Sequence, residues 1–367
     1  MKQTIIFYKN HPALHDHRLY LALGSYYQVL LVCDTPTPER RILNCGWSNE
    51  VGIETLFLSD SSDPRSFVCH IIEKYSDAIH VLCGLRGCRA VRFALPRLLK
   101  NPSSRLAVCQ EMPTRTSGLL RIIQDLIYRA IIARIRKKVQ AFFAMGTIGA
   151  AAYARLGFPE EKIHTTMYSY PGDYPPLPPP TFPSMPIKLI YVGDAVPAKG
   201  VDLLLEAVRL FPNESIHLTI VGSDPNGILS RVQNDPFWSN RLDILGVVPN
   251  KEILGILSRH DLLILPSLND GWGMVVTEAL IAGIGAIVTD ACGSQDIPRF
   301  FGTGQVIPAG SVLAIKDALD QIQRDPKLLF SWKVNARERR DETRPEVIAS
   351  QMFKIFESLF PTLVQAE

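Results

Sequence analysis

A proline-rich run at residues 171–186 divides this chain of 367 residues. Half of the positions in the run are proline, which has no backbone N–H and fixes φ, so neither a helix nor a central strand persists there. We expect an extended, semi-rigid linker at residues 174–186, between a first domain at 1–173 and a second at 187–340. A loop within one domain is less favoured, because structureless loops of this length are uncommon.

On each side of the run, short apolar segments alternate with longer amphipathic ones. The expected strands are 4–8, 28–33, 78–82, 106–109 and 141–144 in the first half and 188–192, 217–221, 242–245, 262–265 and 286–289 in the second. This succession predicts two doubly wound, Rossmann-like α/β domains with parallel sheets, facing each other across a cleft. Residues 341–367, with an expected helix at 346–360, either complete the second domain or cross back to the first.

Composition excludes several classes of protein. A hydrophobic content of 47% with 20% charged residues is typical of a globular chain with an ample core, and a net charge of +3 is too small to indicate a nucleic-acid partner. The seven cysteines are scattered, odd in number and without a C-x-x-C pair, which favours reduced thiols in a cytoplasmic protein. No apolar run is long enough for a signal peptide or a membrane span.

Residues 266–278 are the most informative segment. Here Asp270 follows an expected strand, a glycine-containing turn comes next, and Glu278 lies eight positions further on. The residues after Gly273 predict a helix, whose first N–H groups have no partner in the helix and carry the positive end of its dipole. Such an end suits a diphosphate, and Glu278 would reach sugar hydroxyls. A plain strand–turn–helix joint gives the same pattern.

Three further loops of the second half fit the same chemistry. Lys199 lies at a loop-to-helix junction just after Gly193, where an ammonium can neutralise a phosphate. Gly222 ends the next expected strand with a turn that can line a nucleotide pocket, and the backbone near Val248 could contact a base edge. Taken singly, each is also typical of a solvated lysine or an ordinary turn.

In combination, residues 189–298 resemble the donor domain of glycosyltransferase family 4, which has the GT-B fold. The positions that match the pattern of the family are Gly193, Lys199, Gly200, Gly222, Gly246, Val248, Asp261, Pro266, Ser267 and Glu278. The resemblance implies a retaining, metal-independent glycosyltransferase that uses a nucleotide-sugar as substrate and needs no cofactor.

The resemblance also implies roles for single residues. Lys199 would bind the donor diphosphate from one side, Glu278 would hydrogen-bond the ribose, and Asp270 would lie near the transferred sugar. The backbone that holds the diphosphate from the other side would come from Gly271, Trp272, Gly273, Met274 and Val275. Two positions depart from the family: Asp194 stands where an arginine is usual and Asp270 where a glutamate is usual. Another cation must compensate for Asp194, or its side chain must point away.

The first half carries the weaker, acceptor-binding signals. Glu111 follows an expected strand and could stabilise positive charge or accept the proton of the acceptor, so Glu111, Lys199 and Asp270 are the candidate catalytic residues. His15 and Arg86 are candidate acceptor-binding residues. The histidine-containing run at 11–17 could instead bind a metal, but no complementary ligand cluster appears, so we favour an acceptor-lining loop or a helix start.

A long helix is expected at 118–139. Its apolar stripe comprises Leu119, Ile123, Leu126, Ile127 and Ala130, and Arg134, Arg136, Lys137 and Lys138 cluster near its end. Either the stripe packs on the core, or the basic helix contacts anionic lipid head groups. The second reading suits a peripheral membrane enzyme whose acceptor is linked to a polyprenyl lipid.

The sequence thus predicts transfer of a sugar from a nucleotide-sugar to an oligosaccharide or lipid-linked acceptor, in surface-polysaccharide or lipopolysaccharide biosynthesis. Two alternatives remain. One is a nucleotide-sugar epimerase of the same layout. The other is a turnover-deficient nucleotide-sugar-binding scaffold, which Asp194 favours.

Overall fold

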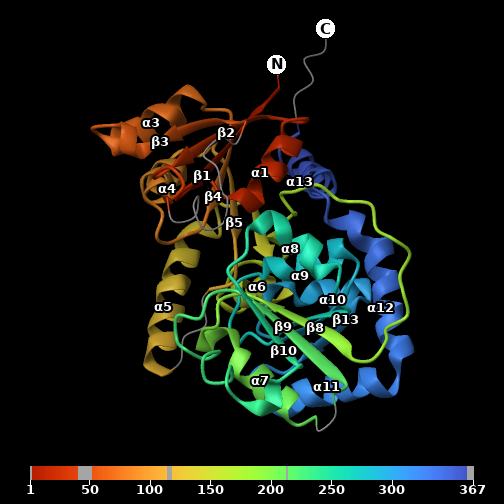
Figure 1. Ribbon diagram of the computed structural model, residues 1–367. Helices are drawn as coiled ribbons and strands as arrows, with labels where there is room; N and C mark the ends of the chain where they lie inside the picture. The colour runs from red at the N-terminus through yellow and green to blue at the C-terminus, as the bar shows by residue number, and fades with distance from the viewer. Residues whose placement is uncertain (1, 40–51, 114–117, 212–213, 362–367) are drawn as a thin grey trace. The chain divides into compact units, whose positions relative to one another are not determined.

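The computed structural model describes residues 2–39, 52–113, 118–211 and 214–361. Its contacts divide the chain into two compact units (Figure 1). The first unit comprises Met1–Pro171 together with Thr343–Glu367, and the second comprises Gly172–Glu342. Cys45, one of the seven cysteines, lies outside the described residues.

The first unit is built on one seven-stranded parallel sheet of order β3-β2-β1-β4-β5-β6-β7. Its strands are β1 Thr4–Lys9, β2 Gln28–Cys33, β3 Glu54–Phe57, β4 Ile79–Cys83, β5 Arg105–Gln110, β6 Ala141–Met145 and β7 Ile163–Thr166. Its helices include α1 Leu14–Leu23, α3 Pro64–Lys74, α4 Arg89–Lys100, α5 Gly118–Ile135, α6 Gly146–Arg155 and α13 Pro345–Leu359.

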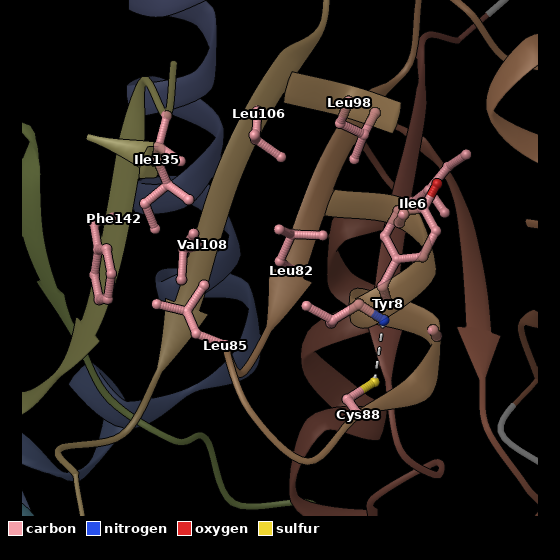
Figure 2. Close-up of a cluster of buried hydrophobic side chains, with 14 of the residues drawn as sticks. Ile6, Tyr8, Leu82, Leu85, Cys88, Leu98, Leu106, Val108, Ile135 and Phe142 are labelled. Atoms are coloured by element: carbon pink, nitrogen blue, oxygen red, sulfur yellow. Dashed lines mark hydrogen bonds between the residues drawn. The ribbon is translucent and has the colours of Figure 1, made fainter. Parts of the chain in front are cut away.

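The central strands of this sheet are mostly apolar because helices cover both faces. On one face, side chains of β1, β4, β5 and β6 pack against α4 and α5; Figure 2 shows Leu82 and Val108 of the sheet in one layer with Leu98 and Ile135 of these helices. On the other face the core includes α1 and α13, and Phe353 of α13 stacks on Tyr26 with ring centroids 4.3 Å apart.

The second unit has a six-stranded parallel sheet of order β10-β9-β8-β11-β12-β13. Its strands are β8 Ile187–Val192, β9 Ile216–Val221, β10 Leu242–Gly246, β11 Leu262–Leu265, β12 Gly285–Thr289 and β13 Gly304–Ile307. Its helices include α7 Val201–Arg209, α8 Asn250–Leu257, α9 Met274–Ala282, α10 Asp296–Phe301, α11 Val312–Arg324 and α12 Pro326–Arg339. The strand order reverses between β8 and β11, and at such a switch point doubly wound sheets bind ligands.

The proline-rich residues 174–186 form neither helix nor strand. They are anchored to the end of α12, where the Arg337 guanidinium donates hydrogen bonds to the carbonyl oxygens of Leu177 and Pro178. Arg340 likewise donates to the carbonyl oxygen of Pro175 at 2.7 Å. Side chains at the end of α12 therefore hold this segment in place within the second unit.

The structure contradicts one of the two readings of helix α5, in which its apolar stripe packs on the core. The expected apolar stripe does not pack on its own unit: Leu119 is 70% exposed and Leu126 is 61% exposed. The side chains that α5 buries are Tyr128, Ile132 and Ile135, and none of them belongs to the expected stripe. No described helix combines the length and the apolar composition needed to cross a bilayer.

Candidate functional site

The loops that follow β8 and β9 lie against each other through two glycines. At Gly222, with φ +143°, a Cβ would lie 2.0 Å from the carbonyl oxygen of Gly193, so a side chain at Gly222 would clash with backbone. The amide of Gly222 donates to the carbonyl oxygen of Gly246 at the end of β10. Val248 is half-buried in the loop that follows. These candidate residues therefore share the carboxyl edge of the sheet.

Lys199 ends a short 3-10 turn, Pro197–Lys199, just before α7. The next residue, Gly200, has φ +66°, and a Cβ there would lie 2.2 Å from the carbonyl oxygen of Pro266. This close approach brings the turn to the end of β11. There the Lys199 Nζ lies 2.5 Å from the Asp270 Oδ2, with side chains 30% and 12% exposed. The structure thus pairs two predicted site residues that are far apart in sequence.

The turn between Asp270 and Gly273 is held by the residues that follow β12. The amide of Asp270 donates to the carbonyl oxygen of Ala291 at 3.1 Å, and the amide of Ser294 donates to that of Trp272 at 2.8 Å. The Cys292 thiol is 2.9 Å from the same carbonyl oxygen. The sequence prediction missed this supporting segment. Its one sequence signal is the small residues that follow β12.

Helix α9 starts directly after this turn. Gly273 has φ +86° at the N-cap position, and no side chain of the described residues caps the first amides of the helix. Those amides carry the positive end of the helix dipole. Trp272 is buried, and its indole N–H donates to the Thr277 hydroxyl at 3.2 Å. In this structure the Trp272 ring supports the turn, while Met274 and Val275 begin the helix.

Glu278 lies four residues into α9, about one turn beyond Met274. Its side chain is only 7% exposed, and burial raises the pKa of its carboxyl group to about 7. Within the described part of the chain, no side chain or amide is hydrogen-bonded to this carboxyl group and no cation pairs with it. A buried acid without a partner is costly unless a ligand completes its hydrogen bonds, so Glu278 is suited to bind hydroxyl groups.

Asp194 is engaged by the loop after β9. Its carboxylate accepts a hydrogen bond of 2.6 Å from the Ser223 hydroxyl and one of 3.4 Å from the Ser223 amide. Its own carbonyl oxygen accepts a hydrogen bond of 2.9 Å from the Tyr191 hydroxyl. The carboxylate that replaces the usual arginine of the resembled family therefore has a structural partner.

The first unit contains a cavity of about 430 Å³ at the carboxyl ends of β1, β4 and β5. Glu111 lines it and accepts a 2.9 Å hydrogen bond from the Tyr168 hydroxyl. His15, in α1, lies edge-on to the Tyr168 ring with centroids 4.4 Å apart. The structure thus brings His15 and Glu111 to one cavity through a shared tyrosine.

Two residues of this cavity were not assigned a role from the sequence. Lys9 at the end of β1 and Asp16 in α1 form a buried ion pair, and the Lys9 Nζ is 3.2 Å from the Tyr20 hydroxyl. Burial alone would raise the pKa of Asp16, but the charges of Lys9 and His15 and the hydrogen bonds with Lys9 and Tyr20 together outweigh burial and lower that pKa. The cavity therefore combines fixed charges with hydroxyl groups.

Arg86 does not itself line the cavity of Glu111 and His15. Its guanidinium stacks over the ring of Tyr128, which does line that cavity, at 5.7 Å from the ring centroid. It borders a different hollow, between α4 and α5. The predicted acceptor-binding pair is therefore not brought together by the structure.

The described residues include six cysteines and show no metal-binding cluster. Among them, no group of three or more His, Cys, Asp or Glu side chains is arranged to hold a metal ion. The histidine-containing run at 11–17 contains the start of α1, as one of its two favoured readings predicted. The six described cysteines are free thiols.

Known proteins share parts of this sequence and its fold. Residues 178–339 match the family model described as Glycosyl transferases group 1. Lipopolysaccharide glucosyltransferase WaaG of Escherichia coli K12 is 28% identical over 167 residues, which are 42% of this chain and 41% of that protein. N-acetyl-alpha-D-glucosaminyl L-malate synthase of Bacillus anthracis is 27% identical over 172 residues, 46% of this chain and 44% of that protein. The match spans less than half the length of these relatives.

The similarity to solved structures extends beyond residues 178–339. The crystal structure of Anabaena Alr3699/HepE in complex with UDP aligns with a TM-score of 0.71 at 14% identity, covering 98% of this chain and 100% of that one. This confirms the predicted class of two parallel-sheet, Rossmann-like α/β domains of the GT-B type. The segment that matches the glycosyl transferases group 1 model, residues 178–339, contains the donor-site candidates.

Proposed function

We propose that this chain is a retaining glycosyltransferase. It takes a sugar from a nucleotide-sugar and transfers it to an oligosaccharide or lipid-linked acceptor, in the assembly of a surface polysaccharide or lipopolysaccharide. The observation that carries the proposal is the paired Lys199 and Asp270 beside the uncapped start of α9, with the unpartnered Glu278 one turn further along.

Donor binding follows from the charges of this site. A diphosphate competes with Asp270 for the Lys199 ammonium and accepts hydrogen bonds from the first amides of α9. Glu278 accepts hydrogen bonds from the ribose hydroxyls. Lysine and helix dipole together supply positive charge at the leaving group, which is the role that a metal ion has in other transferases. Asp270, displaced from Lys199, is then free to contact the transferred sugar.

Acceptor binding is assigned to the cavity of the first unit. Glu111 and its partner Tyr168 offer a carboxylate and a hydroxyl, and His15 adds a ring that can donate or accept a proton. These groups suit an acceptor with several hydroxyls, and Glu111 is the group that would take up the proton of the attacking hydroxyl.

Helix α5 supports a lipid-linked acceptor. The large apolar side chains that it exposes are Leu119, Leu120, Ile122, Ile123, Leu126 and Ile127. Exposed Arg134, Arg136 and Lys137 follow on the same helix and loop. Apolar groups next to cations are typical of a helix that lies in the interface of an anionic bilayer, so we include peripheral membrane contact in the proposal.

The donor half of the proposal is tested by thermal unfolding with UDP-, GDP- and ADP-sugars. Structures of Anabaena HepE contain UDP or UDP-glucose, so UDP-sugars are the first to try. A ligand at about a hundredfold its Kd should stabilise the chain by about 2.7 kcal/mol. Lys199→Ala should lose this shift, and Lys327→Ala, at an exposed lysine of the same unit, should keep it.

Transfer is tested with a bound donor and a panel of glycan and lipid-linked acceptors. Product analysis by NMR should show a new glycosidic bond with the anomeric configuration of the donor; inversion would refute the retaining mechanism. An epimerised sugar formed from donor alone would support the epimerase alternative. Donor binding without transfer to any acceptor would support the scaffold alternative.

A further inference from the structure

A hollow of about 440 Å³ lies between α4 and α5 of the first unit, apart from the cavity of Glu111. Its floor includes Leu85 and Ile135, which Figure 2 shows within the buried core. Half-buried Leu95, Leu99 and Ile131 also line it. A hollow of this size and apolar lining is typical of sites for small molecules with hydrocarbon parts.

Four exposed arginines also line this hollow: Arg86, Arg89, Arg92 and Arg134. Within the described ranges, none of the four guanidinium groups pairs with a carboxylate, whereas Arg97 of the same helix α4 has its guanidinium 2.6 Å from Glu73. The start of α4 is already capped by Asp34, which accepts hydrogen bonds from the first two amides of the helix. The guanidinium groups that line the hollow are therefore available to bind an anion.

We propose that this hollow binds one anionic lipid, with a hydrocarbon chain against its apolar lining and a phosphate against its arginines. An apolar hollow bordered by unpaired cations is complementary to a molecule with a hydrocarbon chain and an anionic head. Guanidinium groups bind phosphate oxygens in pairs, and they do so more strongly next to apolar surface than in bulk water. The chemical class is thus an alkyl or prenyl phosphate, or a phospholipid.

Access to the hollow rests on the membrane contact proposed for α5. Ile131 lines the hollow, and Ile123, exposed on the same helix, is eight residues away, a rise of about 12 Å. A bilayer that receives the exposed apolar residues of α5 would therefore place lipid head groups close to the arginines. The hollow itself belongs to one unit and needs no contact from the other.

Soluble probes test the hollow without a membrane. Calorimetry should show binding of monomeric dodecyl phosphate, and much weaker binding of both dodecyl maltoside and inorganic phosphate. The double variant Arg92→Glu with Arg134→Glu should bind dodecyl phosphate roughly a hundredfold more weakly, because two charge-assisted contacts become repulsive. Ile131→Trp should also weaken binding, because the indole fills the hollow.

A control variant carries the same change of charge elsewhere. Arg65 and Arg231 are exposed and lie outside the hollow, so Arg65→Glu with Arg231→Glu should leave dodecyl phosphate binding unchanged. Thermal unfolding of every variant checks that the fold is intact. The proposal would be overturned if Arg92→Glu with Arg134→Glu bound dodecyl phosphate as tightly as the wild type. It would also be overturned if the wild type bound dodecyl maltoside or inorganic phosphate as tightly as dodecyl phosphate.

Vesicles separate this inference from the membrane contact on which its access rests. Wild-type protein should sediment with phosphatidylcholine vesicles that contain phosphatidylglycerol, and Leu119→Ser with Ile123→Ser should lose this while keeping dodecyl phosphate binding. Dodecyl phosphate binding without vesicle binding would support the hollow and refute the membrane contact. Vesicle binding without dodecyl phosphate binding would refute the hollow alone, and neither result depends on sugar transfer.

Discussion

Replacing Glu278 by glutamine should stabilise the donor-free protein, increasingly so at higher pH. The pKa of this carboxyl group is raised by burial from 4.5 to about 7 in the folded chain. An acid whose folded pKa lies above its unfolded pKa costs stability as the pH rises, because the unfolded chain ionises first. The cost begins near the unfolded value and is complete above the folded one. Glutamine has nearly the same shape and does not ionise, so the variant avoids this cost.

The magnitude follows from the difference of the two pKa values. About 2.5 units at about 1.36 kcal/mol each set a limit of about 3 kcal/mol. The advantage of Glu278→Gln over wild type should be about 1 kcal/mol at about pH 5 and about 3 kcal/mol at about pH 8. Urea unfolding followed by tryptophan fluorescence suits the measurement, because Trp238, Trp272 and Trp332 all lie in the second unit.

Glu252→Gln, at an exposed glutamate of the same unit, serves as the matched control and should show no comparable dependence on pH. If Glu278→Gln gave the same advantage at both pH values, or destabilised the chain at about pH 8, the inference of a costly buried carboxylate would be wrong. The same variant should lose donor affinity, since a neutral amide is a weaker acceptor than a carboxylate for hydrogen bonds from two hydroxyl groups. Greater stability with weaker binding is the expected signature of a functional acid.

Three further predictions concern the donor site. Gly200→Ala should destabilise the second unit by about 3 kcal/mol or more, and Gly246→Ala by only about 1 kcal/mol. Both glycines have positive φ, but only at Gly200 would an added Cβ clash with backbone. Equal losses of stability in urea unfolding would contradict this geometry. Lys199→Ala should weaken donor binding and turnover by about tenfold or more, while Asp270→Asn should mainly reduce turnover. Calorimetry measures the binding and product assays measure the turnover. Full activity in both variants would show that neither residue belongs to the site. Donor binding at about pH 7 should release protons from Glu278. The binding heat measured by calorimetry should then depend on the ionisation enthalpy of the buffer. A binding heat that is the same in all buffers would exclude the contact between Glu278 and the donor.

Most strands were predictable from the sequence because parallel strands covered on both faces are apolar throughout. The three that were not among the expected strands, β3 Glu54–Phe57, β7 Ile163–Thr166 and β13 Gly304–Ile307, are edge strands with one neighbour each. Their residues are mostly half-buried or exposed. An edge strand needs fewer apolar side chains, so short segments such as these resemble loops.

Helix α5 shows a different limit. Its sequence is apolar on more than one face, so periodicity could not select the face that packs on the sheet. The structure buries Tyr128, Ile132 and Ile135, spaced by four and three residues, and leaves the more hydrophobic beginning of the helix exposed. Which apolar residues are covered depends on the neighbouring elements, and local sequence does not specify those.

The candidate donor site was predictable in its members but not in its pairings. Motif order placed Lys199 at a loop-to-helix junction and Glu278 in the helix after the turn. The ion pair between Lys199 and Asp270 joins residues 71 positions apart, and it arises only when β8 and β11 become neighbours. The hydrogen bond from Ser223 to Asp194 likewise needs β8 beside β9. Contacts between loops of neighbouring strands depend on sheet order, which single-sequence patterns do not contain.

These pairings bear on the two departures from the pattern of the resembled family. Before a donor binds, Asp270 neutralises Lys199, and the diphosphate that replaces it would both gain the lysine and release the carboxylate toward the sugar. Asp194 has a separate partner in Ser223, so its charge is stabilised by a hydroxyl and an amide. We infer that the shorter acid at Asp270 is suited to exchange between lysine and sugar. The acid at Asp194 then acts as a cap of the neighbouring loop, and the positive charge that would hold the diphosphate comes from Lys199 and α9.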